Sequence, residues 1–394
     1  LMGQLPFLQQ AKPDTTITVD STAIHDFVPA YSVQYTAEFN TYKHFIEESS
    51  VNQLFFDTTF MNTRSNTDSS FFNVFKHAFH LKAFENPDRK FTFGKLAYIE
   101  NELVRAVHPL PYGRRIYTYS NLNAGAEIYN QSATFLKWRA LANLTFLGRN
   151  IGDATIKGEV IKPIVLKADT MSIEAEAWYR DFSANIFEEH WQSNHFKWDN
   201  NFKKQHEVVV RSKFSYPNAK LYAGFDYALL SNFLYNNQLG MPDQYNNEFS
   251  VVAAWLNKDF HFWRFIWSNK AVWQAVSNNT VLRLPVASAY SSISYSHYLF
   301  KVMKINIGAE VYYNTPFNAN FYEPSTTRFY LQDELLTGGY PLINLYANAK
   351  LKRTRAFAIL EHANSRFKFG EFFSTPRYPL EQMTFRFGLL WTFY

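Results

Sequence analysis

The segment that ends the chain constrains the fold most strongly, because its side chains alternate in polarity. One set of alternate positions holds Met383, Phe385, Phe387, Leu389, Trp391 and Phe393. The intervening set holds Thr384, Arg386, Gly388, Leu390, Thr392 and Tyr394. A β-strand points alternate side chains to opposite faces, so one face of this segment is almost wholly apolar and aromatic. The pattern predicts a lipid-facing strand; the alternative is a half-buried C-terminal strand of a soluble β-sandwich.

Composition excludes a helical membrane protein. Hydrophobic residues make up 47% of the chain, yet no apolar run approaches the ~20 residues that a spanning helix needs. Aromatic residues reach 19%, which suits both β-strands and the aromatic girdles of outer-membrane barrels. Cysteine is absent, so disulfides and thiolate metal sites are excluded, and we expect neither a metal nor a cofactor.

Similar alternation recurs along the whole chain. Tyr31, Val33 and Tyr35 oppose Ser32 and Gln34, for example. We expect strands near 30–40, 73–84, 91–99, 116–129, 133–146, 153–165, 172–183, 206–215, 219–229, 248–258, 262–276, 290–301, 304–314, 341–352, 355–364 and 382–394. The polar face of these strands is as regular as the apolar face, as expected for solvent outside a sandwich or for the wet lumen of a barrel.

Connection lengths favour the barrel, because transmembrane barrels alternate short periplasmic turns with longer outer loops. Long links are expected at 41–72, 100–115, 184–205, 230–247, 277–289, 315–340 and 365–381, with a shorter one around Gly148. The sequence therefore predicts an all-β transmembrane antiparallel barrel of about sixteen strands, within a range of about 14 to 18. We assign 1–26 to an N-terminal periplasmic segment and 27–394 to the barrel, and interpret the start at Leu1, without a signal peptide, as a mature or truncated product.

Two C-terminal segments resemble a known family. They are GGYPLINLYANAKLKRTRAFAILEHANS (338–365) and YPLEQMTFRFGLLWTFY (378–394), and the spacing of Arg386, Gly388, Trp391 and Phe393 is similar to the C-terminal insertion signal of bacterial outer-membrane barrels. Together they resemble the putative porins of Bacteroidetes-type bacteria, many of which are longer on the N-terminal side. The resemblance implies a channel in the outer membrane of a Gram-negative bacterium, contacting lipids and inserted by the barrel-assembly machinery.

A barrel of about sixteen strands is too wide for side chains to fill, so we expect an aqueous channel for passive diffusion of small polar solutes. The proposed pore-lining residues are Lys137, Arg139, Arg180, Arg211, Lys213, Arg264, Lys350 and Arg386. Further basic candidates are Lys76, Lys82, Lys157, Lys220, Lys258, Lys270 and Lys352, against the acidic Glu38, Glu127, Glu159, Glu174, Glu176, Asp226 and Glu310. This excess of basic residues favours anions; the alternative is that the charges pair across neighbouring strands.

Other functions find less support. The net charge of +5 could suggest nucleic-acid binding, but the basic residues are spread singly along strands, without a nucleic-acid-binding module. No G-x-S-x-G or H-E-x-x-H motif indicates a barrel enzyme. The segment 187–202 contains His190, Trp191, His195 and Trp198, which suggests a sugar-binding or metal-binding loop, although the histidine spacing does not fit a usual ligand pair. Either 41–70 or 315–340 is expected to fold inward and narrow the pore. A plugged barrel that binds a partner, as an oligomer or within a membrane-protein complex, is the alternative function.

Overall fold

The computed structural model describes residues 30–51, 56, 58–86, 92–166, 169–367 and 372–393. The predicted periplasmic segment 1–26 and the terminal Tyr394 lie outside these residues. Within the described part of the chain, no helix is long and apolar enough to cross a membrane.

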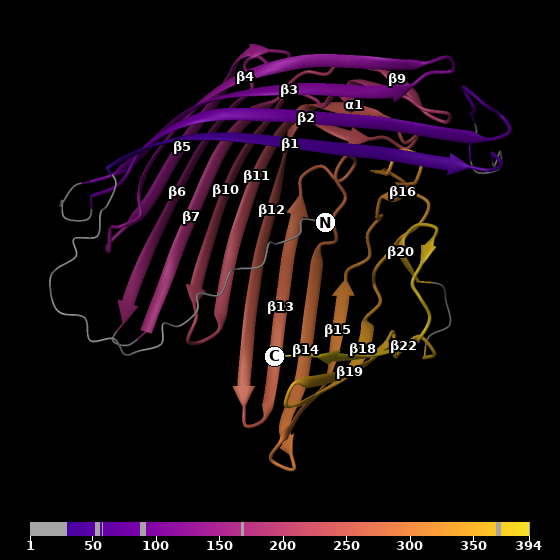
Figure 1. Cartoon of the computed structure of the whole chain (residues 1–394). Helices are drawn as coiled ribbons and strands as arrows, with labels where there is room; N and C mark the ends of the chain where they lie inside the picture. Colours follow the sequence, from indigo (N-terminus) through magenta and orange to yellow (C-terminus); the bar gives the residue numbers. More distant parts are fainter. Residues whose placement is uncertain are drawn as a thin grey trace.

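One antiparallel sheet of sixteen strands forms the molecule (Figure 1). Its strands follow one another in chain order, so each pairs with its sequence neighbours through a hairpin or a loop. They are β1 (Tyr31–Glu48), β2 (Asn66–Ala83), β3 (Gly94–Pro109), β4 (Arg114–Asn130), β5 (Lys137–Gly148), β6 (Ala154–Leu166), β7 (Asp169–Phe182), β10 (Gln205–Tyr216), β11 (Leu221–Asn236), β12 (Pro242–Phe262), β13 (Phe265–Val276), β14 (Ala287–Leu299), β15 (Met303–Asn314), β18 (Leu342–Leu351), β19 (Thr354–Glu361) and β22 (Thr384–Trp391). Each predicted strand overlaps one of them.

Several strands continue beyond their predicted outer ends. β1 and β2 extend over much of 41–72, β3 and β4 meet at a turn over 110–113, and β11 and β12 meet at 237–241, where long loops were expected. The alternation fades in these extensions, since neither face has to meet lipid there. The backbone ladder nevertheless continues, as shown by the register between Glu48 and Asn66. Strand length was therefore underestimated where polarity no longer separates the two faces.

The outward face of the sheet is apolar and uncovered. Phe385, Phe387, Leu389 and Trp391 are 63%, 77%, 77% and 62% exposed. No second packed sheet covers them among the described strands, whereas a soluble sandwich would bury such side chains. Cross-strand aromatic pairs collect toward the short-turn end, with ring centroids 5.2 Å apart for Phe260 and Trp267. These features confirm the transmembrane antiparallel barrel fold predicted from the sequence.

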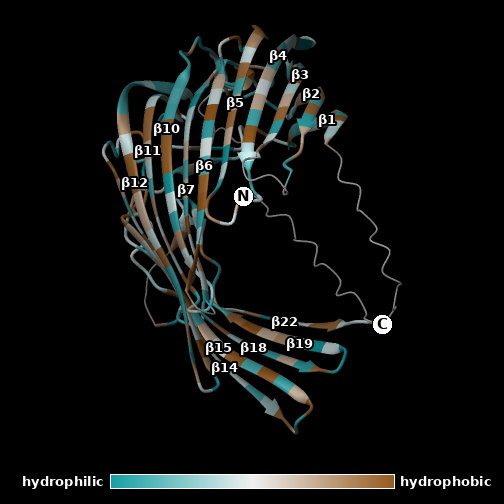
Figure 2. Cartoon of the chain, turned by 90° about the vertical axis from the view of Figure 1, so that its left-hand side faces the viewer, coloured by the Kyte–Doolittle hydropathy of each residue, from teal (hydrophilic) through white to brown (hydrophobic). Residues whose placement is uncertain are grey.

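β1 and β22 are the two edges of the sheet. Figure 2 shows a curved sheet in which these edges stand apart. The hydrogen-bonded closure expected between the last strand and the first is therefore not made within the described residues. The sixteen strands follow an arc that is shallower than a closed ring of the same strands requires.

Inward-facing glycines receive aromatic rings from neighbouring strands. A Cβ on Gly224 would lie 2.3 Å from the Trp255 ring, and one on Gly388 would lie 2.5 Å from the ring of Phe357. Gly388 and Phe357 are register partners across β19 and β22. The glycine that the sequence analysis placed in the insertion signal thus has a packing role of its own, because only a residue without Cβ leaves room for this ring.

Candidate functional site: pore wall and outer mouth

The face opposite the exposed aromatic side chains is called here the inner wall. Strand register places most of the predicted pore-lining residues on it, because each pairs with residues that share its face. They are Lys137 and Arg139 of β5, Arg180 of β7, Arg211 and Lys213 of β10, Lys350 of β18 and Arg386 of β22.

A row of charged residues crosses the inner wall at one level. Arg139, Glu159, Glu176, Arg211 and Asp226 are successive register partners on five adjacent strands, β5, β6, β7, β10 and β11. Strand pairing alone brings these side chains side by side, although they span nearly ninety positions of sequence. Two cavities of about 300 Å³ and about 240 Å³ open along this row.

Most of these cations have a carboxylate partner on the same strand or a neighbouring one. Arg139 Nη2 lies 2.8 Å from Glu127 Oε2, and Lys213 Nζ lies 3.1 Å from Glu174 Oε2. The remaining ion pairs of this kind join Arg180 to Glu207 at 3.1 Å, Arg211 to Asp226 at 3.9 Å, Arg386 to Glu361 at 2.8 Å, Lys76 to Glu102 at 3.2 Å and Lys157 to Glu176. Such partly exposed pairs stabilise the fold by only ~0–1 kcal/mol each, so their main consequence is local cancellation of charge.

Arg264 lies away from the inner wall. It belongs to the tight turn between β12 and β13, where its guanidinium lies over the Trp263 ring and 3.3 Å from the Tyr295 hydroxyl. Tyr295 faces outward, since it is the register partner of Phe265 and Ile307. A tight turn interrupts the alternation of the strand, so the sequence pattern assigned Arg264 to the wrong face, and the residue belongs to the short-turn rim.

Lys258 also differs from expectation, because it shares its face with the exposed Leu256 and Phe260. Its ammonium reaches the Ala219 carbonyl in the adjacent turn, as expected for a lysine that extends from an apolar surface toward the polar rim. Lys220 and Lys352 occupy turn positions with φ of 48°. All three therefore lie at the short-turn end.

The connection 183–204, called here the mouth loop, folds inward across the opposite end of the sheet. It contains α1 (Ile186–Glu189), β8 (His190–Gln192) and β9 (Lys197–Asp199), which Figure 1 shows under β1 to β4. The ring of Phe187 lies 4.7 Å from that of His108 on β3, and Trp191 lies 5.7 Å from His44 on β1. A loop that connects β7 and β10 is thus packed on the inner wall of the first strands.

Two residues fasten the mouth loop to the β1–β2 hairpin and are called the latch. Asn194 is completely buried; its side-chain oxygen accepts from the backbone N–H groups of Met61 at 3.0 Å and Asn62 at 2.9 Å, and its amide donates to the Asn62 carbonyl at 2.9 Å. His195 Nε2 lies 2.7 Å from Glu48 Oε2. These contacts join segments more than 130 positions apart in sequence.

The sequence analysis identified this segment as a ligand-binding candidate but not as the inward loop. Its two histidines contact different carboxylates, His190 that of Asp199 at 2.6 Å and His195 that of Glu48. Over the described ranges of the chain, no three His, Cys, Asp or Glu residues gather in a way that could hold a metal ion. The high content of Trp, Phe and His in this segment could have predicted the inward loop, because a segment so rich in aromatic side chains tends to bury them.

The connection 315–341 extends the same layer. It contains the hairpin of β16 (Phe321–Glu323) and β17 (Arg328–Tyr330). Arg328 donates to the Phe187 carbonyl at 3.2 Å and lies over the Trp198 ring. Burial lowers the pKa of this guanidinium, while the Glu188 carboxylate opposes that effect. Leu331 N–H donates to the Asn236 carbonyl at 3.1 Å, so this loop ties the mouth loop to β11.

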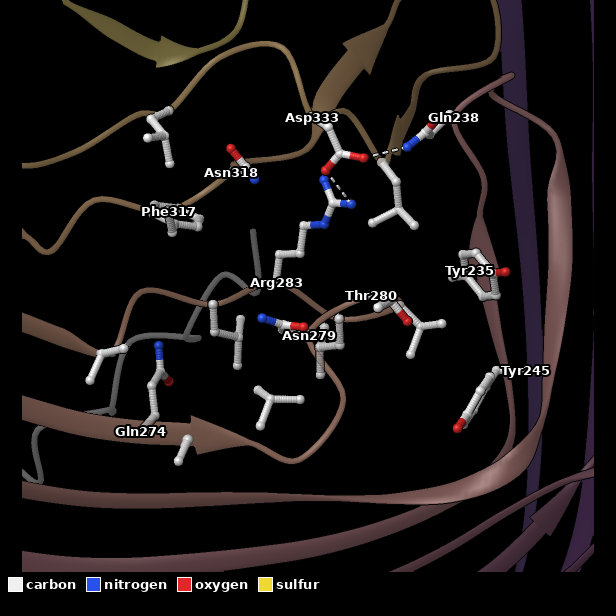
Figure 3. A pocket seen from close by; sticks show the side chains of 18 of the residues that line it. Tyr235, Gln238, Tyr245, Gln274, Asn279, Thr280, Arg283, Phe317, Asn318 and Asp333 are labelled. Carbon is white, nitrogen blue, oxygen red and sulfur yellow. Dashed lines mark hydrogen bonds and ion pairs between the residues drawn. The ribbon is translucent and has the colours of Figure 1, made fainter.

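Three segments form a layer across the outer end, called the mouth layer: the mouth loop, 315–341 and the described part of 362–383. The last of these contains β20 (Phe373–Thr375) and β21 (Tyr378–Pro379). Beneath it lies a cavity of about 840 Å³, bounded by the β11–β12 hairpin, the 277–286 loop and 315–341 (Figure 3). A second hollow of about 590 Å³ shares Gln238, Leu331 and Asp333 with the first.

Comparison with known proteins agrees with this architecture. The family described as "Putative porin" matches residues 9–394, whereas a search of curated proteins finds no match. Similar solved structures include a mutant of the ferric enterobactin receptor PfeA from Pseudomonas aeruginosa (TM-score 0.63, 11% identity, 91% of this chain and 59% of that chain). Others are the copper transporter OprC (0.63, 11%, 91% and 61%) and the siderophore receptor PirA from Acinetobacter baumannii (0.62, 7%, 91% and 59%). The chain spans about three fifths of the length of these structures, and at such identities the likeness shows the fold alone.

Proposed function

The chain belongs to this porin family, and we propose that it is a passive diffusion channel for small hydrophilic solutes. As a member it is an outer-membrane β-barrel transporter in a Gram-negative bacterium. Diffusion needs a wet path and no chemical step, so we infer that the protein is not an enzyme. Outer-membrane lipids contact its outward face, and the barrel-assembly machinery is the expected partner during insertion.

The observation that carries the proposal is the exposed, charged inner wall below the mouth layer. The side chains of Arg139, Arg180, Arg211 and Lys213 are 45%, 44%, 54% and 44% exposed even though each is paired. Inward-facing side chains would be buried if the described loops packed against the wall at this level. The described loops therefore leave the charged wall beneath the mouth layer exposed, which supports a diffusion pore.

Pairing on the wall predicts weak charge selectivity. A paired carboxylate cancels most of the field of its cation, so the excess of basic residues in the sequence overstates the field in the lumen. Among the described residues, four lysines of the wall form no ion pair with a carboxylate, namely Lys82, Lys137, Lys270 and Lys350. Three glutamates form none with a basic residue, namely Glu38, Glu159 and Glu310. We infer at most a small preference for anions.

Planar bilayers test the proposal. Purified, heat-modifiable protein should produce stepwise, ohmic conductance in KCl, and liposomes containing it should swell in small sugars but not in large ones. A folded barrel that never conducts contradicts passive diffusion.

The alternative is a plugged barrel that binds a partner, as an oligomer or within an outer-membrane complex; the extensive mouth layer is the observation that favours it. Deleting 184–203 separates the two functions. A diffusion channel conducts before the deletion and conducts more after it. A plugged barrel conducts only after the deletion.

A further inference from the structure

We propose that the cavity beneath the mouth layer binds a neutral, polyhydroxylated solute of one or two sugar units. This site deepens the proposed diffusion function, because it would hold the solute at the outer end of the path. Its volume of about 840 Å³ falls within the ~300–1,000 Å³ that is usual for small-molecule sites. It is lined by three separate outer connections and by Gln274 and Val276 at the end of β13, so it lies inside the mouth rather than on the outward surface.

Hydrogen-bonding capacity points to a hydroxylated ligand. The amides of Asn279 and Asn318 line the cavity and have no hydrogen-bond partner within the described chain. Figure 3 shows them on either side of Arg283. Gln274 uses its amide N–H toward the Pro285 carbonyl at 2.8 Å, which leaves its amide oxygen as an acceptor. A side-chain amide both donates and accepts, and so matches a hydroxyl group, which does the same.

Aromatic rings supply the other half of the recognition. Tyr235, Tyr245 and Phe317 line the same cavity. The ring carbons offer apolar area to the C–H face of a sugar, while the amides meet its hydroxyls. A strongly hydrated inorganic ion would gain nothing from these rings, whereas a purely apolar solute would leave the amides unpaired.

The balance of charge in the cavity favours a neutral ligand. Arg283 and Asp333, the charged pair of this cavity, lie 2.7 Å apart. Arg283 also donates to the Gln332 carbonyl, and Asp333 accepts from the Gln238 amide. Each charge is therefore already satisfied by protein groups. An anion near Arg283 would be repelled by Asp333, and a cation near Asp333 would be repelled by Arg283, whereas a neutral solute meets no such repulsion.

Isothermal titration calorimetry of the full chain in detergent tests this site, with maltose as the probe and gluconate as an anion of similar chemistry. Maltose should bind, and gluconate at least about tenfold more weakly. The double substitution Asn279→Leu with Asn318→Leu removes both free amides and keeps the branching of the side chains. Loss of the two hydrogen bonds should weaken maltose binding at least about tenfold. The matched control, Asn246→Leu with Asn247→Leu, changes two exposed amides of β12 outside the cavity and should leave binding unchanged.

Three results would overturn the proposal: no maltose binding, binding that the Asn279 and Asn318 substitutions leave unchanged, or gluconate binding as tight as that of maltose. Bilayer conductance keeps this outcome separate from the proposed function. A conducting channel that does not bind maltose overturns only the binding site. A barrel that binds maltose at these residues but never conducts overturns only passive diffusion.

Discussion

Releasing the latch should open the outer mouth. The substitution Asn194→Ala deletes three side-chain hydrogen bonds, two from backbone N–H groups at 3.0 and 2.9 Å and one to a carbonyl at 2.9 Å. Each contributes about 0.5–1.5 kcal/mol, and the sum of about 3 kcal/mol corresponds to roughly a hundredfold change in the equilibrium between the fastened and the released loop. The strand ladder is untouched, so the barrel should remain folded.

Single-channel recording measures this change directly. We expect Asn194→Ala to spend more time in a higher-conductance state than the unmodified protein, and to be cleaved faster by protease within the mouth loop. The matched control is Asn130→Ala, which also loses bonds to a backbone carbonyl and a backbone N–H, those of Thr92 and Ala133, but at the short-turn end of the sheet. If both variants conduct like the unmodified channel, the latch does not hold the constriction and the reasoning is refuted.

Three further changes test the wall and the last strand. Simultaneous replacement of Arg139, Arg211 and Lys213 by Gln leaves the carboxylates of Glu127, Asp226 and Glu174 unpaired. The reversal potential under a salt gradient should therefore shift toward cation selectivity, and return toward zero near 1 M salt, where the Debye length is ~3 Å. An unchanged potential would place these residues away from the constriction. Deleting 391–394 should abolish heat-modifiable protein in the membrane, because it removes the end of the β22 strand; normal abundance would contradict this role. Gly388→Ala forces a Cβ against the Phe357 ring and should lower the free energy of unfolding by ~1–3 kcal/mol. Gly158→Ala, whose Cβ would have open space around it, should lower it much less. Equal urea midpoints of unfolding for the two variants would show that the Phe357 ring moves aside freely.

The sixteen strands could be predicted because membrane strands carry a local signal. Lipid on one face and water on the other impose a two-residue period, which Phe385 to Trp391 shows within seven positions. The same two-residue period predicted the face of the sheet on which Arg139 and Lys213 lie. Their carboxylate partners, Glu127 and Glu174, depend on the register between strands, which turn lengths fix and the period alone does not.

The mouth layer could not be predicted in this way. The contact between His195 and Glu48 spans 147 positions and that between Arg328 and Phe187 spans 141. The two-residue period cannot predict such contacts, since they depend on how far the sheet curves between the strand that carries the loop and the strands that the loop contacts. The sequence analysis therefore expected 41–70 or 315–340 to narrow the pore. The structure places 315–341, one of these two candidates, in the mouth layer. It adds 183–204, which is held by Glu48 and 58–62 on one side and by Arg328 on the other.

Within the described residues, the edge strands β1 and β22 carry unpaired backbone groups, and hydrocarbon does not tolerate such groups. An even number of strands makes β1 and β22 antiparallel, so direct pairing is allowed by geometry, and we expect it in the membrane. The chain contains no cysteine, which permits a clean cross-linking test: Tyr35→Cys combined in turn with Phe385→Cys, Phe387→Cys or Leu389→Cys samples successive registers of the outward face. A disulfide should form in one of these pairs in membrane-inserted protein. If the barrel is folded and no outward-facing pair of β1 and β22 cross-links in this or the neighbouring registers, with Val33→Cys or Phe39→Cys in place of Tyr35→Cys, direct pairing of these edges is refuted.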